Sequence, residues 1–155
     1  MSDAHNAQLD WDEHGQPLSR SYGDVYFSRA NGLEETRHVF LAHNQIIERC
    51  QALPAGGRLV IGETGFGTGL NFLCAWQAFA EHAPRDARLH FVCVEKFPLA
   101  LADLQRALAL WPELAPYAGQ LLAQYRALHP GFQRLLLDGG RVVLTLMIGD
   151  VLDCL

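Results

Sequence analysis

Apolar residues follow two different spacings along the chain, and the two spacings alternate. Short continuous apolar runs are typical of strands buried in a parallel sheet, and they cover residues 58–63, 89–95 and 141–148. Elsewhere apolar residues recur every three or four positions, which predicts helices over 34–52, 70–82, 98–111 and 113–128. This order predicts an α/β fold with at least one right-handed crossover.

The first predicted helix carries a single apolar stripe. Its members are Val39, Ala42, Ile46, Ile47 and Cys50. Before this helix, residues 8–28 mix turn signals with short apolar runs, and we expect short strands or extended segments there.

Asp138-Gly139-Gly140 lies between the apolar runs 132–137 and 141–148, which is a strong signal for a β-hairpin. We expect the strand that ends at Ile148 to leave an unpaired sheet edge. With partly uncovered apolar helix faces, such an edge would make the isolated chain prone to associate.

The composition is that of an ordinary globular domain, with 155 residues of which 50% are hydrophobic and 19% are charged. We divide it into an N-terminal extended segment with a helix, 1–57, and the first half of a Rossmann-like domain, 58–155. The net charge of -5 contrasts with the basic excess of most nucleic-acid-binding domains. An RNA partner would therefore be held by a local patch or by parts outside this chain.

No apolar stretch reaches the roughly 20 residues that a membrane-spanning helix needs, and the N-terminus is too polar for a signal peptide. The 4 cysteines are far apart and match no metal-ligand spacing. We expect a cytoplasmic protein with reduced thiols, no metal site and no membrane contact.

The segment Glu63-Thr64-Gly65-Phe66-Gly67-Thr68-Gly69 carries the clearest chemistry, because alternate glycines separate a strand from a helix. Glycine lets a ligand approach the backbone, and the helix N-terminus offers free N–H donors. A dinucleotide site would need a further glycine where Leu70 or Phe72 stands. A phosphate-binding loop would need a lysine after its last glycine, and the sequence has none there.

Three carboxylates follow the three predicted parallel strands. Glu63 would repel a pyrophosphate and favour a cationic amine or sulfonium, and S-adenosylmethionine carries both groups without a phosphate. Glu95 ends the second strand, where an acid can accept both ribose hydroxyl protons. Asp150 is placed to accept from the adenine amine. The candidate cofactor-binding residues are Glu63, Gly65, Gly67, Gly69, Glu95 and Asp150, and no catalytic residue can be assigned.

Two simpler interpretations stay open. A glycine-rich turn between a strand and a helix can serve tight packing alone. An acid after a strand is often only a turn residue or a helix cap, and this interpretation applies to Asp150.

Gly62-Glu63-Thr64-Gly65-Phe66-Gly67-Thr68-Gly69-Leu70-Asn71-Phe72, with residues 22–28 and 32–37, resembles the methyltransferase domain of the bifunctional tRNA wobble-uridine modification family. This family forms 5-methylaminomethyl-2-thiouridine, and the resemblance covers nearly all of residues 9–155. It implies a class I S-adenosylmethionine-dependent methyltransferase that acts on tRNA. It also implies a fused C-terminal oxidase that uses FAD to remove a carboxymethyl group first.

The resemblance places Glu63, Gly65, Gly67 and Gly69 in the first cofactor motif, Glu95 at the ribose and Asp150 near the adenine. It also suggests that Tyr26, Arg29 and Asn31 approach the same crevice. The family's Asp-Gly-Phe-Ala-Pro-type segment, which lines the methyl-transfer site, is not in this sequence. We therefore expect a truncated domain that carries half of the cofactor site and is inactive alone. Two alternatives are a non-catalytic cofactor-binding fragment and a methyltransferase-like enzyme that acts on a small amine.

Overall fold

The computed structural model describes residues 5–20, 22, 26, 32–125 and 129–154. Within these ranges the main sheet has four strands in the order β3-β4-β6-β5. They are β3 (Arg58–Thr64), β4 (Arg88–Glu95), β5 (Gly131–Leu137) and β6 (Val142–Ile148). β3, β4 and β6 run parallel, and β5 runs antiparallel to β6. The predicted α/β, Rossmann-like fold is confirmed.

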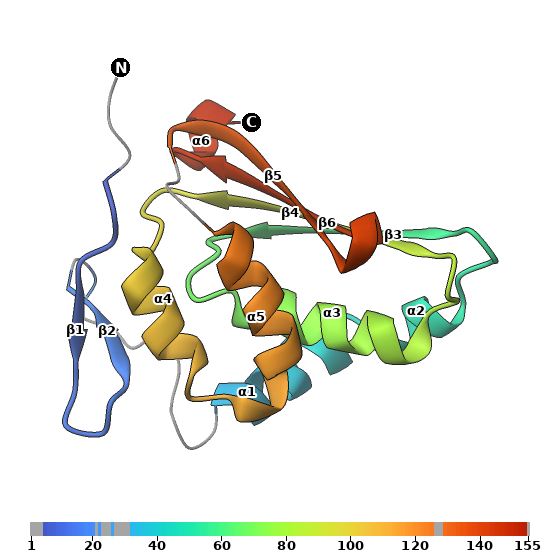
Figure 1. Cartoon of the computed structure of the whole chain (residues 1–155), viewed down its shortest axis with the longest axis horizontal. Coiled ribbons are helices and arrows are strands. Elements are labelled where there is room, and N and C mark those ends of the chain that lie inside the picture. The colour runs from blue at the N-terminus through green and yellow to red at the C-terminus, as the bar shows by residue number, and fades with distance from the viewer. Residues whose placement is uncertain (1–4, 21, 23–25, 27–31, 126–128, 155) are drawn as a thin grey trace.

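The principal helices lie along one face of this sheet (Figure 1). The longer ones are α3 (Leu70–His82), α4 (Leu101–Leu108) and α5 (Ala115–Gln124). The shorter helical elements are α1 (Gly32–Glu35), the π-helix η1 (Thr36–Ala42), α2 (Ile46–Gln51), the 3-10 turns η2 (Pro112–Leu114) and η3 (Asp138–Gly140), and α6 (Val151–Cys154).

The core lies between the sheet and α3. The ring centroid of Phe72 is 5.8 Å from that of Trp76 and 5.1 Å from that of Phe91 on β4. Successive side chains of a strand point to opposite faces, so β3 alternates between buried Leu59 and Ile61 and exposed neighbours. Phe91 and the inward side chains of β3 meet the apolar stripe of α3, as its 3.6-residue spacing predicted.

The predicted hairpin at 138–140 is confirmed, but the expected sheet edge is wrong. Positive φ angles of 64° at Gly139 and 90° at Gly140 turn the chain back on itself, so that Leu135 of β5 pairs with Leu144 of β6. β6 therefore lies inside the sheet between β4 and β5. Among the described strands, the open edges are β3 and β5.

The single helix predicted over 34–52 is also wrong, because three elements share this stretch. Gln45 adopts a left-handed φ of 53° between η1 and α2. The wider turn of a π-helix changes which side chains face the core, so Leu41 is buried whereas Val39 is 50% exposed. In α2, Ile46 and Cys50 are buried as predicted.

A short hairpin precedes the main sheet, as expected for residues 8–28. It pairs β1 (Leu9–Trp11) with β2 (Pro17–Ser19) in antiparallel register. The Arg106 guanidinium of α4 lies 4.0 Å from the centroid of the Trp11 ring, and the amide of Ala7 donates to the carbonyl of Pro98 at 2.9 Å. These contacts hold the hairpin against α4.

We expect Gly69→Ala and Gly119→Ala to change stability in opposite directions. Gly69 has a φ of 74°, and a Cβ there would lie 2.8 Å from Cζ of the buried Phe66, so alanine should cost about 1–2 kcal/mol or more. Gly119 lies in α5 with nothing within 4 Å of its Cβ position, so alanine should stabilise the helix by about 1 kcal/mol. Urea unfolding of both variants measures the difference, and equal effects would contradict the loop geometry.

Candidate cofactor site

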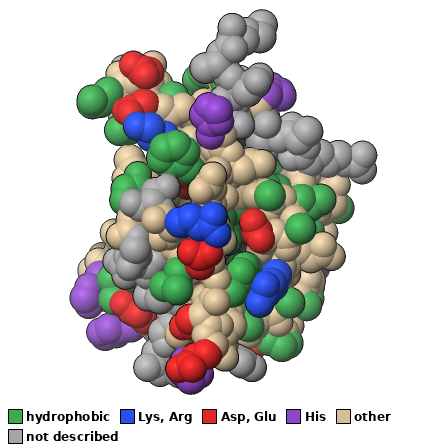
Figure 2. All heavy atoms as spheres, turned by 90° about the vertical axis from the view of Figure 1, so that its left-hand side faces the viewer, with side chains coloured by type: hydrophobic (Ala, Val, Ile, Leu, Met, Phe, Trp, Pro, Cys, Tyr) green, Lys and Arg blue, Asp and Glu red, His purple; other side chains and the backbone are tan. Residues whose placement is uncertain are grey.

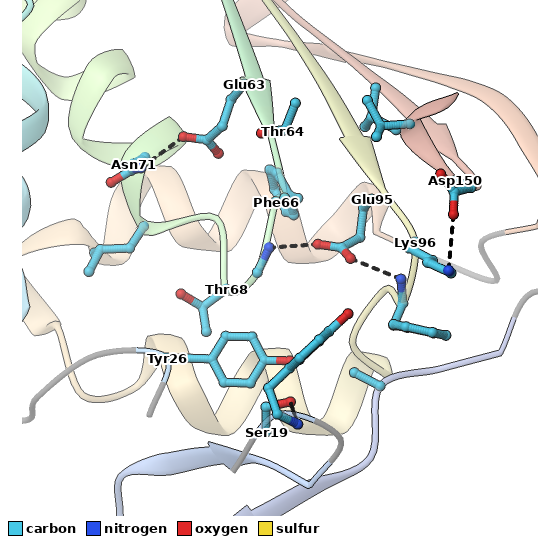
Figure 3. A pocket seen from close by; sticks show the side chains of 18 of the residues that line it. Ser19, Tyr26, Glu63, Thr64, Phe66, Thr68, Asn71, Glu95, Lys96 and Asp150 are labelled. Carbon is cyan, nitrogen blue, oxygen red and sulfur yellow. Dashed lines mark hydrogen bonds and ion pairs between the residues drawn. The ribbon is translucent and has the colours of Figure 1, made fainter. Parts of the chain in front are cut away.

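A pocket of about 800 Å³ lies at the carboxyl ends of β3, β4 and β6. The loop after β3 and the ends of β4 and β6 form most of its wall, and Ser19, Tyr22 and Tyr26 close it from the N-terminal segment. Figure 3 shows acidic side chains from all three strand ends around this space. Its volume is within the usual range of small-molecule sites.

Five of the six residues predicted from the sequence line the pocket: Glu63, Gly65, Gly67, Glu95 and Asp150. The sixth, Gly69, is the N-cap of α3 and packs against Phe66. The structure therefore gathers five of the predicted residues at the carboxyl ends of the strands. Gly69 contributes to the loop that joins them to α3.

Glu95 ties the glycine loop to the end of β4. Its Oε2 accepts from the amide of Gly67 at 2.9 Å, and its Oε1 accepts from the amide of Phe97 at 2.9 Å (Figure 3). The amide of Gly65 also donates to the carbonyl of Val94 at 2.7 Å. Because each carboxylate oxygen has two lone pairs, Glu95 keeps acceptor capacity toward the pocket.

Glu63 is a largely buried acid beside the same loop. Its Oε2 accepts from Nδ2 of Asn71 at 2.8 Å. Burial raises the pKa of Glu63 to about 7, the Asn71 hydrogen bond opposes this rise, and the nearby Glu95 carboxylate adds to it. A cation bound in the pocket would favour the ionised form of Glu63.

Asp150 has two partners on the protein itself. Its Oδ1 accepts from the amide of Leu152 at 3.0 Å, so it caps α6, and its Oδ2 accepts from Nζ of Lys96 at 3.0 Å. The Leu152 amide and then Lys96 lower the pKa of this carboxyl. The cap that the sequence left as an alternative is present, and Asp150 also lines the pocket.

Tyr26 forms part of the wall opposite Glu95 (Figure 3). A Cβ placed on Gly67 would lie 3.4 Å from Cδ1 of Tyr26, so the aromatic ring covers the glycine loop. Burial and then the Glu95 charge raise the pKa of the Tyr26 phenol. Arg29 and Asn31, which were expected nearby, lie outside the described residues.

Sequence reasoning missed Ser19, Asn71 and Lys96 as pocket residues. Asn71 is the second residue of α3, two positions after Gly69, and Lys96 directly follows Glu95, so proximity in sequence was an available signal for both. Ser19 arrives through the docking of the N-terminal hairpin, which no local pattern indicates.

Within the described residues, no helix has both the length and the apolarity to cross a membrane. The same residues contain no group of 3 or more His, Cys, Asp or Glu side chains that could hold a metal ion. Three of the cysteines, Cys50, Cys74 and Cys93, are buried free thiols.

We expect Glu63→Gln to change how stability depends on pH. Folding raises the pKa of Glu63 from an ordinary 4.5 to about 7. The contribution of Glu63 to the free energy of unfolding is therefore complete below pH 4.5 and is lost as pH rises through 7. Relative to the native chain, the variant should gain up to roughly 3 kcal/mol of unfolding free energy between pH 5 and pH 8. Urea titrations at both pH values measure this gain. The exposed Glu48→Gln should show none, and an equal pH response in all three proteins would contradict the burial of an acid here.

No model of a known protein family matches the chain, but whole proteins do. Over all of its length it is 96% identical to the tRNA 5-methylaminomethyl-2-thiouridine biosynthesis bifunctional protein MnmC of Ectopseudomonas mendocina. It is 70% identical to the protein of the same name from Pseudomonas aeruginosa. In both matches the chain spans 24% of the length of the relative.

A crystal structure of MNMC2 from Aquifex aeolicus superposes with a TM-score of 0.67 and 20% identity, over 97% of this chain and 44% of that chain. At this identity the match shows a common fold. The sequence matches confirm the family resemblance over the whole chain. Over its whole length this chain matches the tRNA 5-methylaminomethyl-2-thiouridine biosynthesis bifunctional proteins, and it spans about a quarter of their length.

Proposed function

We propose that this chain binds S-adenosylmethionine and contributes half of a methyltransferase site, within a longer protein that methylates the aminomethyl group of a tRNA wobble uridine. The observation that carries the proposal is the pocket in which Glu63, Glu95 and Asp150 surround a glycine loop without lysine. The names of the relatives support the tRNA product.

The charge of the pocket suits a cationic nucleoside that lacks phosphate. Lys96 is the sole lysine of the chain, and its Nζ is paired with Asp150 at 3.0 Å. Glu63 and Glu95 would repel a pyrophosphate, and a sulfonium or ammonium group would offset the cost of ionising Glu63. Gly65 has a φ of 82° and nothing within 4 Å of its Cβ position, which leaves room for a ligand against the backbone.

Each residue has a distinct task in this proposal. The free lone pairs of Glu95 accept from the ribose hydroxyls, Asp150 accepts from the adenine amine, and Glu63 faces the cationic end. Tyr26 excludes water from one side. Bound S-adenosylmethionine supplies an electrophilic methyl group, and catalysis then depends mainly on holding a neutral acceptor amine in line with it.

The rest of the proposed enzyme follows from the family. We propose that tRNA is bound mainly outside this chain, because its net charge is -5. On the face that Figure 2 shows, acidic, basic and apolar side chains of the described residues are interspersed. The second activity of the bifunctional relatives would be the oxidase that uses FAD, and tRNA modification would place the whole protein in the cytoplasm.

Labelled methyl transfer tests the proposal. This chain should be joined to the remaining sequence of the Ectopseudomonas mendocina relative and supplied with labelled S-adenosylmethionine. We expect label in tRNA that carries 5-aminomethyl-2-thiouridine and none in unmodified tRNA or in spermidine. Binding of the cofactor without transfer would leave only the cofactor-binding alternative, and labelled spermidine would favour the small-amine alternative.

We expect Glu95→Gln to weaken the binding of S-adenosylhomocysteine. The carboxamide keeps one acceptor oxygen, so it cannot accept from both the Gly67 and the Phe97 amides. It also offers fewer acceptor sites to the ribose hydroxyls, and we expect a cost of about 1.5–3 kcal/mol in binding free energy. Isothermal titration measures the affinity, with the exposed Glu48→Gln as the matched control. Unchanged affinity in Glu95→Gln would remove Glu95 from the site.

We expect Tyr26→Ala to discriminate between two ligands that differ in charge at sulfur. A sulfonium near an aromatic face gains about 0.5–2 kcal/mol of binding free energy, whereas the thioether of S-adenosylhomocysteine carries no charge. The variant should therefore lose more affinity for S-adenosylmethionine than for S-adenosylhomocysteine. Tyr26→Phe keeps the ring and should bind both ligands as the native chain does. Equal losses of affinity for the two ligands in Tyr26→Ala would show that the ring acts by shape alone and does not interact with the charge at sulfur.

A further inference from the structure

The acids of the pocket are held by different kinds of hydrogen-bond donor. Glu95 accepts from backbone amides, and Asp150 accepts from the ammonium of Lys96 and from a backbone amide. Glu63 accepts from the side-chain amide of Asn71, with 2.8 Å between Nδ2 and Oε2 (Figure 3). The position of Glu63 therefore depends on a neutral side chain, whereas Asp150 has a charged partner.

The turn between β3 and α3 brings Asn71 to Glu63. Glu63 lies near the end of β3, and Asn71 is the second residue of α3. The glycine loop between them folds back with positive φ angles, 82° at Gly65 and 56° at Gly67, so that the two side chains meet. Both side chains line the pocket, and the hydrogen bond between them therefore borders the space that a ligand would fill.

The other groups that face Glu63 do not stabilise its negative charge. Sγ of Cys93 on β4 lies 4.0 Å from Oε1 of Glu63. Burial, and then the charges of Glu63 and Glu95, raise the pKa of the Cys93 thiol, so it stays protonated at neutral pH. Burial and the Glu95 charge also raise the pKa of Glu63, and the Asn71 hydrogen bond lowers it. Among the described residues, no lysine, arginine or histidine forms an ion pair with Glu63.

A neutral donor has an advantage over a cation at this position. A lysine or arginine paired with Glu63 would cancel the charge of the carboxylate and would repel a cationic ligand. The Asn71 amide orients the carboxylate and leaves its net charge in place. A donor to a carboxylate also favours the ionised form over the protonated form, and hydrogen bonds to charged groups are the stronger ones.

We propose that Asn71 is a positioning residue that holds Glu63 ionised and thereby sets the pH range over which the pocket takes a cationic ligand. The choice of S-adenosylmethionine as that ligand rests on the proposed function. The effect of Asn71 on Glu63 itself does not, because it is present before any ligand binds.

The pH midpoint of Glu63 in the ligand-free protein is the first measurement. The protonated carboxyl gives an infrared C=O band that Glu63→Gln removes, and the band can be followed in this chain joined to the remaining sequence of the Ectopseudomonas mendocina relative. We expect Asn71→Leu and Asn71→Ala, which lack a donor, to raise the midpoint by about one pH unit, as for a lost hydrogen bond to a charged group. Asn71→Gln keeps an amide donor and should raise the midpoint less.

Asn44→Leu is the matched control. Nδ2 of Asn44 also donates at 2.8 Å, to the carbonyl of Phe40, and Asn44 does not line the pocket. The control should leave the midpoint of Glu63 unchanged.

The pH dependence of S-adenosylmethionine binding to the same joined protein is the second measurement. With a midpoint one unit higher, Asn71→Leu should bind about five- to tenfold more weakly than the native protein at pH 6.5 and within about twofold of it at pH 8.5. The ratio of the two affinities at each pH removes the titration of the ligand itself. In a Glu63→Gln background, Asn71→Leu should give a ratio that does not change with pH.

An unchanged infrared midpoint in Asn71→Leu and Asn71→Ala would overturn the proposal, and so would an equal rise in Asn71→Gln. A loss of affinity that is the same at both pH values would also overturn it, because a purely structural role of Asn71 predicts that result. If the native joined protein binds no S-adenosylmethionine at either pH, the proposed function fails, and the infrared midpoints still decide the role of Asn71.

Discussion

The Glu95 carboxylate accepts hydrogen bonds from the amides of Gly67 and Phe97, and these two bonds join the glycine loop to the turn after β4. Without them, both amides would lose this acceptor, and the loop would keep the bond from the Gly65 amide to the Val94 carbonyl, at 2.7 Å, as its link to β4. Hydrogen bonds to a charged acceptor are the stronger kind. The position of Gly67, against which the Tyr26 ring lies, therefore depends on Glu95.

In the proposed site, Glu63 provides the selectivity for the charge of the ligand. A carboxyl with a pKa of about 7 lies beside a second acid and accepts from Nδ2 of Asn71 at 2.8 Å and from Sγ of Cys93 at 4.0 Å. Its ionised form is costly in the empty pocket and would become favourable beside a bound cation. The same acids would oppose phosphate, so in the proposed site the ligand is selected by charge as well as by shape. The neighbouring Asp150 is less available, because Lys96 and the α6 backbone already engage it.

Spacing patterns predicted the parallel strands, α3 and the gathering of acids at one sheet edge, because strand ends and a glycine turn are local signals. They failed where tertiary context decides. Gln45 interrupts the helix with a left-handed φ although it is neither glycine nor proline, so the residue type did not predict the interruption. The position of β5 beside β6 depends on which way a hairpin folds back onto the sheet. The two amides bound by Glu95 and the arrival of Ser19 depend on contacts between distant segments.

An acidic pocket that takes a cationic, phosphate-free nucleoside next to Glu63 should release protons when this ligand binds. Calorimetric titration with S-adenosylmethionine at pH 6.5, in two buffers with different ionisation enthalpies, counts the protons exchanged. We expect that binding releases a fraction of one proton, that Glu63→Gln abolishes the release, and that ATP does not compete. Binding without proton exchange, or displacement by ATP, would contradict it.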